Sequence, residues 1–123
     1  MSDKIYIFDT TLRDGAQTQG VDFSLDDKEK ISVALDNLGV DYIEGGWPGA
    51  NPTDTEFFNK KHTFNNSILT AFGMTKKTDH SAENDPMISS LINSKANSIC
   101  LFGKSWDFHV DVALGISEEQ NLK

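Results

Sequence analysis

An arginine, an aspartate and a glutamine lie close together in the segment Thr10–Gln17, which reads TTLRDGAQ. Arg13 is the only arginine of the chain, and its guanidinium offers a rigid fork of donors that suits carboxylates and developing oxyanions. Asp14 could pair with that cation or act as one hard ligand of a divalent metal ion. The residue types alone equally allow a polar turn closed by a surface salt bridge. At this stage the segment is a candidate site.

Glu44 and His109 are the other polar residues that could join this segment. Glu44 precedes Gly45 and Gly46, where backbone can pack closely against a ligand, and its carboxylate could orient Arg13 or hold a proton. Its alternative role is a strand-end carboxylate in water. His109 lies among aromatic residues and could either contact a substrate or simply be packed and hydrogen-bonded.

Metal-ligating residues are sparse in this sequence. His62 and His80 lie in polar stretches, where we expect surface residues. The sequence has no His-x-His and no Cys-x-x-Cys, so the chain cannot assemble a metal site rich in nitrogen or sulfur by itself. Asp14 alone would hold a divalent cation only weakly, because such ions want about six ligands.

Short apolar runs alternate with helical patterns and provide the elements that would position these residues. We expect strands over 5–8, 41–44, 67–72 and 98–102. The segment Gly45–Gly49 is predicted to be loop. Strands that alternate with helices imply a parallel sheet with right-handed crossovers, and continuous apolar strands imply that both faces of the sheet are covered.

Capping residues mark the helix starts. Ser24 begins the first helix, and Asn51-Pro52 and Asp85-Pro86 begin the next two. Gly39 ends the first helix. A short helical turn is expected near Val110 to Leu114. Three apolar sets are predicted to face inward: Ile31, Ala34, Leu35 and Leu38 in the first helix; Phe57 and Phe58 in the second; and Met87, Ile88, Leu91 and Ile92 in the third.

The predicted topology places the polar candidates at one edge. In parallel α/β folds, functional groups gather at the carboxyl ends of the strands, and Arg13, Asp14, Glu44 and His109 all follow or end strands. No Gly-x-Gly-x-x-Gly follows the first strand and no phosphate-binding P-loop is present, which argues against a nucleotide-binding fold. The position at a strand end favours a functional site over a polar turn.

Composition limits the classes of partner. The 123-residue chain carries a net charge of −8, which argues against a nucleic-acid or anionic-membrane surface. No apolar run approaches the ~20 residues that span a bilayer. The amino terminus lacks the apolar core of a signal peptide, so a cytoplasmic location is expected. The single cysteine, Cys100, lies in an apolar run and is expected to be a buried, reduced thiol.

The carboxyl end announces a further helix. Ser117 and Gln120 form a capping-box pattern, yet the sequence stops at Lys123. We therefore expect residues 1–123 to be a single partial domain and the amino-terminal part of a longer protein.

Several separated motifs resemble one enzyme family. Leu12 to Gln17, with Lys28 after ten intervening residues, is similar to the first signature of the α-isopropylmalate and homocitrate synthases, members of the DRE–TIM metallolyase superfamily. Asp14, Arg13 and Glu44 match the three residues that give the superfamily its name. The segments Ile43–Gly49, Asn51–Asp54 and Lys104–Val110 are most similar to the citramalate synthase branch. Ala16, where many relatives have glutamate, bears on the branch. The resemblance covers essentially the whole chain.

The resemblance implies the first half, about four βα units, of a (β/α)₈ barrel, since a complete barrel has about 250 residues. It implies a Claisen-type condensation of acetyl-CoA with a 2-oxo acid, most similar to the formation of citramalate from pyruvate in isoleucine and leucine biosynthesis. Asp14 would bind a divalent metal ion (Mg, Mn or Zn), Arg13 and Glu44 would be catalytic, and Arg13, Gln17 and His109 would contact substrate. A homodimer is expected for the parent enzyme.

The resemblance also leaves alternatives open. A 2-isopropylmalate or homocitrate synthase would show the same signature, and a hydroxymethylglutaryl-CoA lyase would run related chemistry in reverse. The family's paired metal histidines, its CoA-binding residues and its carboxy-terminal domain are absent from the sequence. A half-barrel that folds or associates without catalysing anything is therefore a further hypothesis for the isolated chain.

Overall fold

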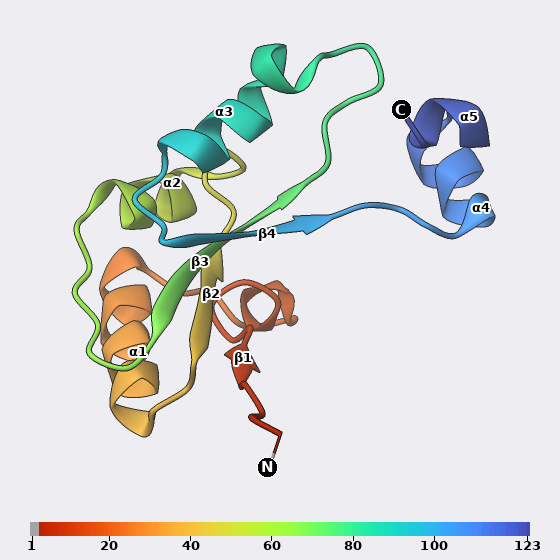
Figure 1. Ribbon diagram of the computed structural model, residues 1–123. Helices are drawn as coiled ribbons and strands as arrows, with labels where there is room; N and C mark the ends of the chain where they lie inside the picture. The colour runs from red at the N-terminus through yellow and green to blue at the C-terminus, as the bar shows by residue number, and fades with distance from the viewer. Residues whose placement is uncertain (1–2) are drawn as a thin grey trace.

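A computed structural model describes residues 3–123. Its four strands are all parallel and lie in chain order in one sheet, β1-β2-β3-β4 (Figure 1). The strands are β1 (Phe8–Asp9), β2 (Tyr42–Gly46), β3 (Ile68–Met74) and β4 (Ser98–Phe102). Helices separate the strands along the chain, so the predicted α/β class is confirmed. The arrangement is that of the first half of a (β/α)₈ barrel.

Three longer helices connect the strands, and each begins at a residue that the sequence marks as a cap. They are α1 (Leu25–Leu38), α2 (Pro52–Asn59) and α3 (Pro86–Asn93). Ser24 and Asp27 form a complete capping box at α1, and the side chains of Asn51 and Asp85 accept backbone N–H bonds at α2 and α3. Gly39 ends α1 at a φ of 87°, in the left-handed region.

Short helical turns complete the chain. Two single 3₁₀ turns, η1 (Gly15–Gln17) and η2 (Ala82–Asn84), precede α1 and α3. Beyond β4, α4 (Asp107–His109) continues as a wider π-helical turn, η3 (Val110–Leu114), and α5 (Glu118–Asn121) follows. Figure 1 shows this last group at the end of an extended segment, away from α1 to α3. Both the predicted turn over Val110–Leu114 and the capping box of Ser117 are confirmed.

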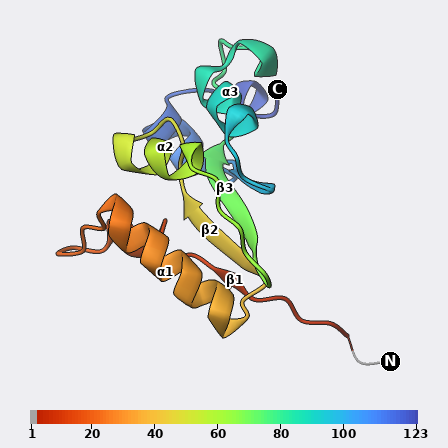
Figure 2. The same ribbon diagram turned by 90° about the vertical axis from the view of Figure 1, so that its left-hand side faces the viewer.

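The core lies between the helices and one face of the sheet. Figure 2 shows α1 and α2 on the same side of β2 and β3. Phe57 and Phe58 of α2 are fully buried, as predicted. The other buried apolar residues of this cluster are Leu12, Val40, Ile43, Leu69, Ala71 and Leu91. Among residues 3–123, neither figure shows α1, α2 or α3 over the opposite face of the sheet.

The first strand differs from the prediction. Only Phe8 and Asp9 pair with β2 as strand, and the apolar residues predicted to form a buried strand are exposed. Ile5 is 85% exposed and Ile7 is 57% exposed. The cause is the position of the segment at the sheet's edge, where no helix among residues 3–123 covers it. Coverage of both faces also fails at β4, where Ile99, Leu101 and Phe102 are exposed.

The two glycines after Glu44 are strand and not loop. Gly45 and Gly46 complete β2, and the pairing with β3 shifts between Glu44 and Gly46, as in a β-bulge. A Cβ on Gly45 would lie 2.8 Å from the ring of Phe57, so the bulge lets α2 pack directly on the backbone. The glycines thus serve helix packing here.

The buried face of α1 is polar, contrary to the prediction. Lys28, Ser32 and Asp36 are buried, whereas Ile31 and Leu35 are only half-buried. Two further residues of the predicted inward set, Ala34 and Leu38, are exposed, as is Ile92 of α3. The backbone N–H groups of residues 65–67, the carbonyl of Leu12 and the carboxylate of Asp54 on α2 lie beside α1. This helix therefore faces partners that only polar side chains can satisfy.

Asp36 explains part of this polar face. Its carboxylate accepts hydrogen bonds from the backbone N–H groups of Asn65, Asn66 and Ser67 at 2.8–2.9 Å, just before β3. Burial opposes ionisation, but these donors outweigh it and hold the pKa of Asp36 below its ordinary value. The carboxylate thereby joins the last turn of α1 to the start of β3.

Three smaller expectations concern Cys100, two histidines and the membrane. Cys100 is free but only half-buried. His62, predicted to be a surface residue, is half-buried and stacks on Phe57 at 4.2 Å, and His80 lies 3.4 Å from Asp85. Among residues 3–123, none of the helices has the length and apolar character needed to cross a membrane.

Candidate functional site

The segment after β1 folds into a tight turn. The carbonyl of Thr10 accepts hydrogen bonds from the backbone N–H groups of Arg13, Asp14 and Gly15 at 2.8–3.2 Å. Asp9 accepts further bonds from the backbone N–H of Thr11 at 3.0 Å and from its hydroxyl at 3.0 Å. Because so many amides converge on one carbonyl, the turn fixes the direction in which Arg13 leaves the backbone.

Arg13 and Glu44 form a close ion pair across the ends of β1 and β2. The Nε of Arg13 donates to Oε2 of Glu44 at 2.7 Å, and the Glu44 side chain is only 1% exposed. The guanidinium also lies over the ring of Phe72 from β3, 4.2 Å from its centroid. The Arg13 side chain is 21% exposed, so part of the guanidinium faces solvent. The predicted proximity of Arg13 and Glu44 is confirmed.

Asp14 sits on the solvent side of the same cation. Its Oδ1 accepts from Nη1 of Arg13 at 3.1 Å, and its side chain is 65% exposed. Gln17 ends η1 and is also exposed. Arg13 therefore bridges one buried carboxylate, which fixes it, and one exposed carboxylate, which can meet an incoming cation.

Cys100 adds a third group near the pair. Burial raises the pKa of its thiol, and the negative charge and hydrogen bond of Glu44 raise it further, while Arg13 lowers it. The thiol therefore stays protonated beside Glu44 at neutral pH.

His109 is not brought to this cluster. It lies in α4 and is exposed. Its ring centroid lies 4.6 Å from that of Trp106 and 6.1 Å from that of Phe108. In Figure 1 the turn that carries it lies on the extended segment beyond β4. The aromatic environment that the sequence indicated is confirmed, but no role in substrate binding follows from it.

The donor set supports one metal ligand. Asp14 presents an exposed carboxylate, which suits a hard divalent cation. Within residues 3–123 there is no group of three or more His, Cys, Asp or Glu side chains that could hold a metal ion. The residues present fit one side of a metal site, and a complete site would need ligands from elsewhere.

Comparison with known proteins places the chain in a family. The model of the HMGL-like family matches residues 4–123, which is nearly the whole chain. The chain belongs to the HMGL-like family. Over 99% of its own length, the chain is 52% identical to an (R)-citramalate synthase of Aquifex aeolicus. Over 96% of its own length, it is 49% identical to the (R)-citramalate synthase of Sulfolobus acidocaldarius. A 2-isopropylmalate synthase of Caldanaerobacter subterraneus is 35% identical over 98% of the chain.

This HMGL-like chain is short beside these relatives. It spans about a quarter of the length of the citramalate synthases, at 24% and 23%, and 30% of the 2-isopropylmalate synthase. The similarity thus concerns the region that holds Arg13, Asp14 and Glu44.

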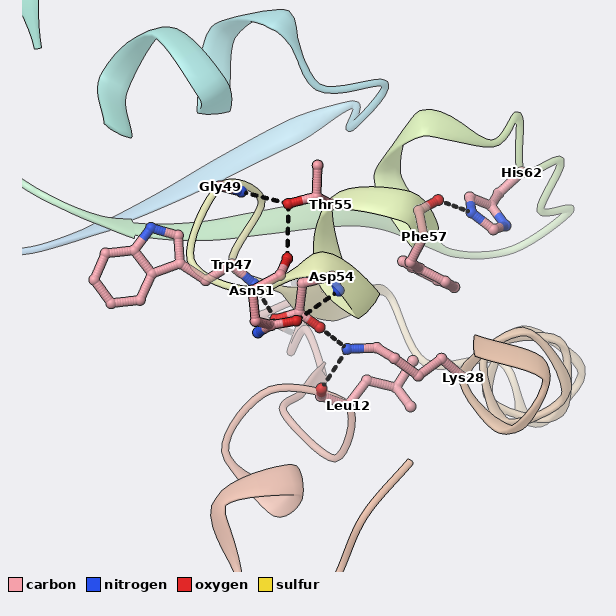
Figure 3. Close-up of polar contacts among 9 residues, drawn as sticks. All are labelled: Leu12, Lys28, Trp47, Gly49, Asn51, Asp54, Thr55, Phe57 and His62. Atoms are coloured by element: carbon pink, nitrogen blue, oxygen red, sulfur yellow. Dashed lines mark hydrogen bonds and ion pairs between the residues drawn. The ribbon is translucent and has the colours of Figure 1, made fainter. Parts of the chain in front are cut away.

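The HMGL-like chain also contains a buried ion pair that the sequence patterns did not assign. The ammonium of Lys28 contacts the carboxylate of Asp54, and it donates to the carbonyl of Leu12 at 3.0 Å (Figure 3). Lys28 is 2% exposed. The signature that includes Lys28 was the only available signal, and it named no partner. Lys28 lies on α1 and Asp54 on α2, 26 residues apart, so only the packing of the two helices brings them together.

Gly46 is required by this pair. A Cβ at Gly46 would lie 2.5 Å from the carboxyl carbon of Asp54, and the backbone there has a φ of 140°. Both facts exclude a larger residue without a shift of Asp54. The end of β2 is therefore shaped around the Asp54 carboxylate.

Proposed function

We propose that the longer protein containing this chain is an acyltransferase that joins acetyl-CoA to a 2-oxo acid. The observation that carries the proposal is the Arg13–Glu44 pair at 2.7 Å, with Asp14 beside it, at the carboxyl ends of the strands. Similarity to (R)-citramalate synthases supports it. A buried carboxylate that holds a partly exposed guanidinium in place is a suitable preorganised donor for a developing oxyanion.

The proposed reaction is a Claisen-type condensation. The methyl group of acetyl-CoA loses a proton, and the resulting enolate carbon attacks the carbonyl carbon of the 2-oxo acid. A carbon–carbon bond forms while the carbonyl π bond becomes an alkoxide, which takes up a proton. Water then cleaves the thioester and releases CoA and the hydroxy diacid.

Arg13 would stabilise the developing alkoxide with its N–H groups. Glu44 would keep the guanidinium aimed, because it accepts the Nε–H bond from a buried position. Asp14 would contribute one ligand to a divalent metal ion (Mg, Mn or Zn). The other ligands of that ion would come from other parts of the longer protein. Such an ion, when bound, supplies Lewis acidity toward the 2-oxo acid. Gln17 and His109 stay proposed substrate contacts.

Pyruvate is the proposed 2-oxo acid, with citramalate as product and isoleucine or leucine biosynthesis as the pathway. The names of the more similar relatives support this choice over a 2-isopropylmalate synthase, whose examples are 34–38% identical. We propose that the longer protein is a cytoplasmic homodimer and that residues 1–123 are the first half of its barrel.

Replacement of Arg13 by lysine tests the function. In the full-length protein with a divalent metal, we expect Arg13→Lys to lower kcat by roughly 10²–10³, as removal of one oxyanion donor does, with the fold intact. CoA release from acetyl-CoA is measured with pyruvate, 3-methyl-2-oxobutanoate or 2-oxoglutarate in turn. The matched control is Lys30→Met, which removes an exposed cation of α1. A near wild-type rate for Arg13→Lys would remove Arg13 from the mechanism.

The isolated chain is expected to be inactive. Its exposed large apolar residues and its unpaired sheet edges favour association of copies. Residues 98–114 alone expose Ile99, Leu101, Phe102, Trp106, Phe108, Val112 and Leu114. Sedimentation at several concentrations should show self-association, and CoA release should not rise above the blank. A stable monomer that turns over would contradict both expectations.

A further inference from the structure

The peptide group between Leu12 and Arg13 is held at both of its polar atoms. Its N–H donates to the carbonyl of Thr10 at 3.2 Å, and its carbonyl accepts from Nζ of Lys28 at 3.0 Å. The Leu12 side chain is fully buried. This peptide lies directly before the Cα of Arg13, so its orientation decides where the guanidinium starts. Lys28 is thus one peptide away from the candidate site without touching it.

Asp54 fixes the ammonium that holds this peptide. Its Oδ1 contacts Lys28, while its Oδ2 accepts from the backbone N–H of Trp47 at 2.8 Å and from Nδ2 of Asn51 at 3.0 Å. Figure 3 shows these side chains converging between α1, α2 and the loop after β2. Trp47 directly follows β2, the strand that carries Glu44. The pair therefore ties the turn that carries Arg13 to the strand that carries Glu44.

Stability alone is a poor reason to bury this lysine. Ammonium and carboxylate groups lose their hydration on burial, and packed apolar residues of similar volume are often as stable. A methionine at position 28 could fill the space beside Phe57, whose ring centroid lies 5.6 Å from the ammonium. A methionine could not donate to the carbonyl of Leu12. The Lys28–Asp54 pair adds a directional hydrogen bond that fixes the orientation of the Leu12–Arg13 peptide.

We propose that Lys28 and Asp54 are positioning residues that set the Arg13–Glu44 geometry through the Leu12 carbonyl. The proposal rests on the proposed function of Arg13 for its biological meaning. Loss of the ammonium frees the Leu12–Arg13 peptide to rotate, and the 2.7 Å bond from Arg13 to Glu44 loses its alignment.

The lone arginine makes this geometry directly measurable. In the 123-residue chain, labelled with ¹⁵N-arginine and kept below the concentration at which it self-associates, Arg13 gives the only arginine Nε–Hε signal. In the unchanged chain this signal should differ from that of free arginine and exchange slowly with water. In Lys28→Met it should move toward free arginine and exchange roughly tenfold to hundredfold faster, as expected for loss of a hydrogen bond between charged groups.

The matched control uses the same helix. Lys30 pairs with Asp26 on the exposed side of α1, so Lys30→Met removes a cation without touching Leu12. Its Arg13 signal should stay unchanged. Asp54→Asn keeps the lysine, and it should shift the signal less than Lys28→Met does.

A second variant separates positioning from folding. Lys28→Met leaves the Asp54 carboxylate buried without its cation, so Lys28→Met with Asp54→Asn removes that penalty. The double variant should regain the amide dispersion of the folded chain and still show a displaced Arg13 signal. The proposal is overturned by a folded variant with an unchanged signal, by loss of the fold in both variants, or by a free-arginine signal in the unchanged chain. Because the readout is a bond within this chain, it is independent of whether the catalytic proposal holds.

Discussion

Two regions of this chain treat polar and apolar side chains in opposite ways. In residues 8–74, the charged side chains of Lys28, Asp36 and Glu44 are buried. In residues 98–121, large apolar side chains such as those of Trp106 and Phe108 are more than half exposed. The first region is built from β1 to β3 with α1 and α2, and the second is β4 with the extended segment beyond it.

The difference shows that burial depends on how many elements meet at a residue. Lys28 lies where α1, α2 and the turn after β1 converge, and each supplies a partner or a wall. The ring of Phe108 lies beside the rings of Trp106 and His109 in its own turn. The first region can therefore retain charges in its interior, because their partners arrive with the packing.

The largest expected contrast comes from truncating one phenylalanine in each region. Phe57→Ala leaves a cavity against a fully buried cluster and should lower the free energy of unfolding by about 4 kcal/mol. Phe108→Ala removes a side chain that is 54% exposed and should cost less than about 1 kcal/mol. Urea unfolding followed by circular dichroism measures both. Equal costs would mean that the extended segment has a packed core of its own.

An intermediate effect is expected from Asp85, the cap of α3. Hydrogen bonds from the backbone N–H groups of Lys77, Ile88 and Met87 lower its pKa to about 2, against desolvation. The unfolded group has the higher pKa, so its contribution of about 2 kcal/mol is fully present above pH ~4 and is lost as pH falls through about 2.

The free energies of unfolding of the unchanged chain and of Asp85→Asn should therefore converge as the solution is acidified toward pH 2. The control is Asp107→Asn, in the exposed turn of α4, which should change stability by less than about 1 kcal/mol at pH 7. A difference for Asp85→Asn that stays constant from pH 7 to pH 2 would contradict the prediction.

The smallest contrast concerns two capping boxes of the same chemistry. Ser24→Ala should lower the free energy of unfolding by about 1 kcal/mol, because α1 is part of the packed region. Ser117→Ala should instead unfold α5 locally and change global stability by less than about 0.5 kcal/mol. Amide hydrogen exchange separates the two outcomes. Protection lost throughout the sheet in Ser117→Ala would join the two regions into one cooperative unit.

Local signals predicted the helix starts and the order of the elements. The caps at Ser24, Asn51 and Asp85 act within three residues, so the sequence alone suffices to place them. The approach of Arg13 to Glu44 was also predictable, because parallel neighbouring strands bring their carboxyl ends to one edge.

Contacts between residues far apart in the sequence could not be predicted from the sequence. The apolar spacing of α1 indicated an inward face that includes Leu38, whereas the structure buries Lys28 and Asp36. Their partners lie 16 to 31 residues away along the chain, and periodicity carries no information about such partners. The prediction that Ile5 is buried was wrong for a related reason. An apolar run shows that a strand could be covered, but it does not show that another element covers it.

The hydrogen bonds of Asp36 also separate a segment of the chain whose length can change from segments whose positions are fixed. By clasping the backbone at Asn65 to Ser67, it closes the intervening strand and helix into a loop whose two ends are fixed to each other. Lys60 and Lys61 are exposed and lie inside that loop, so residues can be added beside them without moving β3. An insertion between 65 and 67 would break the clasp. The segment between Asp36 and Asn65 can therefore change in length while its two ends stay joined to each other.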